Sequence, residues 1–140
     1  MARKSKIQKP TSNKSNTFTI PNTPNYDEVP VIFSLEKIVG DKYCFSKLDD
    51  EDKKQFAESI YKRKNIKWKD IRTIPKHGLG TEKIPRDQIK GTIPSHITED
   101  ISDFLCFRFN GKKPMVGYRE KNIFYILWFD KDFTLYNHGS

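Results

Sequence analysis

The clearest pattern of apolar and polar positions lies in the last third of the chain. Residues 122–130, NIFYILWFD, are apolar at both alternating sets of positions, as in a strand that is covered on both faces. Short polar breaks on either side separate this segment from apolar segments at 115–119 and 133–136, a spacing typical of hairpins. Residues 104–109 alternate in the same way. Together these segments predict an antiparallel sheet of about four strands.

The middle of the chain carries helix signals instead. Asp49 is predicted to be the N-cap of a helix that ends at about Lys64, because acidic residues follow it and basic residues close the segment. A shorter helix fits residues 67–72, and residues 30–35 predict an extended strand. The expected fold class is therefore α+β, with an N-terminal strand and two helices packed on a C-terminal antiparallel sheet.

Composition divides the chain into two parts. Residues 1–29 are rich in Lys, Ser, Thr, Asn and Pro and contain few large apolar side chains, which predicts a disordered basic arm. This arm is interpreted as a solubilising tail, with contact to nucleic acid or to a protein partner as the alternative. Residues 30–140 are expected to form a single α+β domain.

Several classes of protein receive little support. The chain has no apolar run long enough to cross a membrane and no secretion signal at its start, so a cytoplasmic location is expected. The two cysteines, Cys44 and Cys106, are predicted to be reduced, with a disulfide as the alternative. The histidines and cysteines lack zinc-site spacing, and motifs for nucleotide or dinucleotide binding are absent, so neither a metal nor a cofactor is expected.

A basic loop is the first candidate for function. The formal net charge of +8 favours association with a polyanion. Residues 75–94 contain several Pro and Gly residues and predict a long loop, the kind of segment that often builds a binding site. Its candidate nucleic-acid-binding residues are Lys76, His77, Lys83, Arg86 and Lys90.

Two arginines on predicted neighbouring strands are the second candidate. Arg108 alternates onto the same face as Phe104 and Cys106, where a guanidinium needs an acceptor. Arg119 lies beside Arg108 if the two strands pair in simple register. Two such guanidinium groups attract a phosphate. Equally, each can pair with a carboxylate nearby, at Asp103, Glu120, Asp130 or Asp132.

Three segments near the end of the chain complete a recognisable order of elements: FRF at 107–109, MVGYR at 115–119 and IFYILWFDKDFTLY at 123–136. Strand, helix, helix, basic loop and terminal sheet in this order resemble the RelE/ParE-like toxin superfamily over residues 30–138. The last segment also resembles small bacterial and mobile-element proteins that end in a Phe-Tyr-x-x-Trp-x-Asp-x-x-x-x-Leu-Tyr string.

This resemblance implies the toxin of a toxin–antitoxin pair that cleaves RNA, including ribosome-associated messenger RNA, and that an antitoxin protein binds. In such metal-independent cleavage the ribose 2′-hydroxyl attacks the neighbouring phosphate, which requires a base, cations and a proton donor. The resemblance assigns proton transfer to His138 or Tyr136, phosphate charge to Arg108 and Arg119, and loop contacts to Lys83 or His77. The alternative is a non-catalytic nucleic-acid- or protein-binding module of a mobile element.

Overall fold

The computed structural model describes residues 24–139. Its helices and strands are β1 (Ile32–Ser34), α1 (Asp50–Lys62), α2 (Trp68–Ile71), β2 (Glu82–Pro85), β3 (Asp103–Asn110), β4 (Lys113–Glu120) and β5 (Ile123–Phe129). Single 3-10 turns lie at η2 (Tyr26–Glu28), η3 (Phe45–Lys47) and η4 (Arg86–Gln88). The α+β class predicted from the sequence is confirmed.

The sheet is larger and more mixed than the sequence indicated. Its five strands lie in the order β1-β5-β4-β3-β2, and β3, β4 and β5 form the expected antiparallel meander. β1 pairs in parallel with β5, so the predicted N-terminal strand lies within the sheet instead of packing on it. This pairing gives β5, which is buried on both faces, a hydrogen-bonding neighbour on each side.

Two sequence predictions at the edges of the sheet were wrong. Residues 133–136 do not form a strand, because the Asp130 carboxylate accepts hydrogen bonds from the amides of Thr134 (2.8 Å) and Leu135 (3.1 Å) and turns the chain. The predicted loop at 75–94 contains β2, which pairs with β3 and is an edge strand of the sheet.

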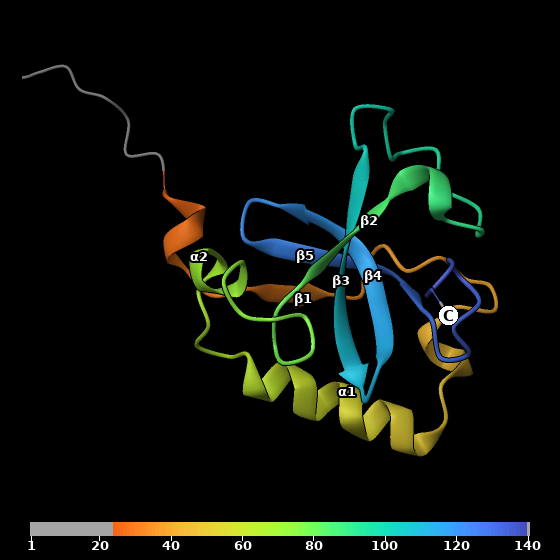
Figure 1. The fold of residues 1–140 in the computed structure, drawn as a ribbon, viewed down its shortest axis with the longest axis horizontal. Helices are drawn as coiled ribbons and strands as arrows, with labels where there is room; N and C mark the ends of the chain where they lie inside the picture. The colour runs from red at the N-terminus through yellow and green to blue at the C-terminus, as the bar shows by residue number, and fades with distance from the viewer. Residues whose placement is uncertain (1–23, 140) are drawn as a thin grey trace, which may run out of the picture.

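Both faces of the sheet are covered. Helix α1 lies across one side (Figure 1), over a core that includes Phe107, Phe124 and Phe129. On the other side irregular segments take the place of a helix and bury a second core, with Tyr43, Ile97 and Leu135 among its members. The sheet is therefore the middle layer, and a side chain's position along a strand decides which core it joins.

The first helix begins as the sequence predicted. The Asp49 side chain accepts a hydrogen bond from the amide of Asp52 (2.7 Å), which makes it the N-cap. At its other end the helix is followed by the C-cap residue Arg63, whose guanidinium is buried and donates hydrogen bonds to backbone carbonyl oxygens.

The start of the chain has two parts. Residues 1–23 of the predicted arm lie outside the described residues. Residues 24–29 hold the η2 turn, in which Asp27 accepts hydrogen bonds from Arg72 (2.9 Å) and Arg119 (2.7 Å). The last part of the predicted arm therefore packs on the domain.

Candidate functional site

A cavity of about 260 Å³ brings together the end of β3, the loop before β2 and the C-terminal segment. Its lining includes three cationic side chains and a single carboxylate: Lys76, Arg108, Lys112 and Glu82. Tyr136 and His138 also line it, so three of the four predicted catalytic residues lie together here. We refer to this cavity as the basic cavity.

Strand alternation places Arg108 in the basic cavity. Phe107 and Phe109 point into the core under α1, so Arg108 between them points to the opposite face. Its Nη1 lies 2.9 Å from Nδ1 of His77. Because a guanidinium only donates hydrogen bonds, this His77 nitrogen must accept, and the predicted loop histidine is thereby held beside the cavity.

His138 is held by a buried carboxylate. Its Nε2 lies 2.9 Å from Oδ2 of Asp130, which is fully buried and also binds the amides of Thr134 and Leu135. An ionised carboxylate only accepts hydrogen bonds, so Nε2 carries the proton that is shared with Asp130. In the neutral ring Nδ1 is then the unprotonated nitrogen, with a lone pair for accepting a proton.

Tyr136 positions His138. The two rings stack with their centroids 3.9 Å apart and an interplanar angle of 30°. The Tyr136 hydroxyl lies 3.7 Å from Sγ of Cys106 in the second core, and burial raises the pKa of Tyr136 far above its ordinary value. This geometry favours a supporting role for Tyr136 over the proton transfer that the sequence predicted.

The cations of the basic cavity differ in their partners. Lys76 forms an ion pair with Glu82 at 3.3 Å. Within residues 24–139, neither Arg108 nor Lys112 forms an ion pair with a carboxylate. In this described part of the chain no carboxylate is paired with either cation, an arrangement that suits an anionic ligand.

The fourth predicted catalytic residue, Arg119, lies on the other face of the sheet. Its guanidinium lies over the ring of Trp68 (4.3 Å) and donates a hydrogen bond to Asp27 (2.7 Å). The expected side-by-side pair of arginines is therefore not formed. A bulge between Arg108 and Asn110 shifts the pairing by one residue, and such a shift exchanges the two faces of a strand.

The remaining predicted loop residues do not enter the basic cavity. Lys83 is exposed and pairs with Leu105, whose side chain packs against the core under α1, so Lys83 lies on the far face from Arg108. Lys90 is exposed and lines a neighbouring recess together with Asn137. Because Asn137 also lines the basic cavity, Lys90 lies close to its border.

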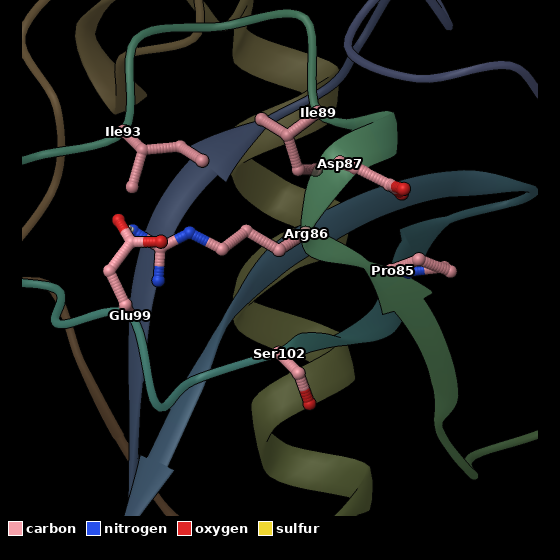
Figure 2. Close-up of a pocket in the computed structure, with 7 residues that line it drawn as sticks. All are labelled: Pro85, Arg86, Asp87, Ile89, Ile93, Glu99 and Ser102. Carbon is pink, nitrogen blue, oxygen red and sulfur yellow. Dashed lines mark ion pairs between the residues drawn. The ribbon is translucent and has the colours of Figure 1, made fainter.

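Arg86 stabilises the protein instead of presenting a free charge. Its guanidinium donates hydrogen bonds to the carbonyl oxygens of Ile97, Thr98 and Ile101 and lies 3.5 Å from the Glu99 carboxylate. It lines a recess of about 590 Å³, in which Figure 2 shows it extended toward Glu99. The charge of this recess is thus largely balanced.

The sequence did not indicate the role of Arg63, which donates a hydrogen bond to the backbone of Arg108, a residue that lines the basic cavity. This side chain is 1% exposed and donates hydrogen bonds to the carbonyl oxygens of Leu79 (2.9 Å), Ser59 (3.0 Å) and Arg108 (3.2 Å). From the sequence it is one of the basic residues that close the helix. Arg63 lies three residues after Ile60, which packs against the core under α1, and this spacing was the signal that the Arg63 side chain faces the protein interior.

Searches of protein-family models, curated proteins and solved structures find no match to the chain. Among residues 24–139, no group of three or more His, Cys, Asp or Glu side chains is arranged to hold a metal ion. The helices in the described part of the chain are all too short or too polar to cross a membrane.

Proposed function

We propose that the protein is an endoribonuclease that binds the phosphate backbone of RNA in the basic cavity. The observation that carries this proposal is the convergence of Arg108 and Lys112 with His138, whose ring is oriented by the buried Asp130. Cations that form no ion pair with a carboxylate of residues 24–139 suit a phosphodiester, and a positioned imidazole suits proton transfer at a ribose hydroxyl.

The proposed reaction uses the 2′-hydroxyl of the substrate as nucleophile. Nδ1 of His138 takes the hydroxyl proton while the 2′-oxygen forms a bond to phosphorus. The bond from phosphorus to the 5′-oxygen breaks, and that oxygen leaves with a proton from solvent. Arg108 and Lys112 stabilise the negative charge that develops on the phosphorane oxygens. The products are a 2′,3′-cyclic phosphate and a 5′-hydroxyl.

The RelE-like fold, the toxin role and the antitoxin partner are part of the same proposal. They are supported by the α+β class, by the antiparallel β3–β5 meander and by the cationic site at its edge. An acidic segment of an antitoxin that covers the basic cavity would block access of RNA. The alternative predicted from the sequence, a non-catalytic nucleic-acid-binding module, uses the same cations but gives His138 no chemical role.

The experiment compares three variants in RNA cleavage and RNA binding. Arg108→Ala is expected to weaken both. His138→Gln is expected to lower the cleavage rate by roughly 100- to 10,000-fold, the range for loss of a general base, with little change in affinity. Arg119→Ala removes the same charge from the other face of the sheet and is the matched control, expected to retain cleavage and binding.

Circular dichroism and thermal unfolding verify that each variant is folded. Binding that weakens steeply with salt, without any cleavage by the wild-type protein, would support the binding module instead. A loss of cleavage in Arg119→Ala but not in Arg108→Ala would contradict the placement of the site.

A further inference from the structure

Phe133 adopts a backbone conformation that bulky side chains rarely adopt. Its φ angle is 61°, and its side chain is 42% exposed. The amides of Thr134 and Leu135 donate hydrogen bonds to the Asp130 carboxylate and close the turn in which Phe133 adopts this angle. Glycine or asparagine would occupy the position with less strain. An exposed phenylalanine here therefore costs stability without filling a core.

The ring of Phe133 lies beside His138, a residue that lines the basic cavity. It contacts His138 edge to face, with ring centroids 5.2 Å apart and an interplanar angle of 87°. The other exposed large apolar side chains of the described residues lie elsewhere: Ile32 on β1, Leu35 just after it, and Tyr61 on α1. Phe133 is therefore the exposed aromatic side chain that adjoins the proposed proton acceptor.

We propose that Phe133 stacks on a nucleobase of single-stranded RNA, next to the phosphate that Arg108 binds. Proteins recognise single-stranded RNA by stacking unpaired bases on aromatic rings, because every base has a π-face. This inference rests on the proposed function and specifies its substrate as an unpaired segment. Stacking would also hold the ribose of that nucleotide close to Nδ1 of His138.

The test measures affinity with three probes that His138 cannot cleave. They are a short 2′-O-methyl oligouridine, an abasic oligonucleotide of the same length and backbone, and inorganic tripolyphosphate. Phe133→Asn removes the ring but suits the left-handed turn, so it is expected to remain folded with equal or higher thermal stability. Phe133→Tyr retains an aromatic face and is the matched control.

For the wild-type protein, oligouridine is expected to bind more tightly than the abasic probe. Phe133→Asn is expected to weaken oligouridine binding by roughly 5- to 100-fold, the range for loss of one stacked base. The same variant should bind the abasic probe and tripolyphosphate like the wild type, and Phe133→Tyr should restore the affinity for oligouridine. A purely structural role of Phe133 would not separate the three probes in this way.

The outcomes distinguish this inference from the proposed function. If Phe133→Asn binds oligouridine as the wild type does, the stacking proposal is overturned, whereas weaker tripolyphosphate binding by Arg108→Ala still supports the phosphate site. If the wild-type protein binds neither tripolyphosphate nor oligouridine, both proposals fail.

Discussion

Replacing Arg63 with Met tests how a buried charge that forms no ion pair among the described residues affects stability. The guanidinium is 1% exposed, and its hydrogen bonds go to the carbonyl oxygens of Ser59, Leu79 and Arg108. These oxygens belong to α1, to the loop before β2 and to β3. Methionine fills much of the same space but donates no hydrogen bond.

Two opposing contributions decide the result. Burial lowers the pKa of Arg63 from 12.5 to about 10, and at about 1.4 kcal/mol per pKa unit the buried charge costs about 3 kcal/mol at neutral pH. The folded state binds this proton less tightly, so the cost applies below pH 10 and disappears as the pH rises toward 12.5. Against this, each carbonyl oxygen that loses its donor costs about 1–3 kcal/mol. With three such oxygens the loss is about 6 kcal/mol, and the expected net destabilisation is about 3 kcal/mol.

Urea unfolding measures this difference. With a slope of about 2 kcal/mol per molar urea, the midpoint of Arg63→Met should fall by roughly 1.5 M. Lys62→Met, at the neighbouring exposed position, is the control and should change stability by less than about 1 kcal/mol. Arg63→Lys should be at least as unstable as Arg63→Met, because it retains a buried charge without the planar fork. A Met variant as stable as the wild type would refute the reasoning, since charge desolvation would then outweigh the hydrogen bonds.

Two further substitutions test the packing of the sheet and of α1. Burial raises the pKa of Asp52, but hydrogen bonds, the largest from Lys113, outweigh this effect, so the pKa lies below 3.8. The ionised carboxylate therefore stabilises the folded state, and this stability is lost as the pH falls through the lowered pKa. Asp52→Asn should therefore lose about 3 kcal/mol in urea unfolding at about pH 7, and its stability should depend less on pH in the acid range. In Gly117→Ala the new Cβ would collide with the carbonyl oxygen of Tyr125, so a thermal-unfolding loss of about 3 kcal/mol or more is expected. In Gly40→Ala the new Cβ would meet no atom of the described residues within 4 Å, apart from its chain neighbours. This variant should be nearly neutral and is the control for the added methyl group.

Local patterns were sufficient to predict the meander and the start of α1. β3, β4 and β5 follow apolar alternation between short turns, and the Asp49 cap depends on residues within three positions of it. Pairing over long distances in sequence was not predictable in this way. β1 is too short to show which strand it joins, and β2 has four residues that end at Pro85, within a segment rich in turn-forming residues.

The sequence predicted only part of the site, because a bulge in β3 changes which residues of β3 and β4 share a face. Asn110 pairs with Lys113 across a tight turn, and continuing that register would place Arg108 and Arg119 on one face. The bulge pairs Arg108 with Pro114 instead, so the two guanidinium groups point to opposite faces. Bulges depend on tertiary packing, and alternation along a single strand does not reveal them. Arg108 and His138 come together because of the turn at Asp130. The sequence indicated this residue as a carboxylate that can pair with an arginine, not as the partner of the histidine.

Asp130 links the stability of the fold to the geometry of the basic cavity. Its carboxylate binds the amides of Thr134 and Leu135, fixes the turn that sets Phe133, and accepts the hydrogen bond that orients His138. Loss of activity in an Asp130 variant would therefore have two explanations: a disrupted turn, or the loss of the hydrogen bond that orients His138. A His138 variant leaves both amide hydrogen bonds in place. If that variant loses RNA cleavage while its thermal unfolding is unchanged, a disrupted turn cannot explain the loss. A chemical role of the imidazole can explain it.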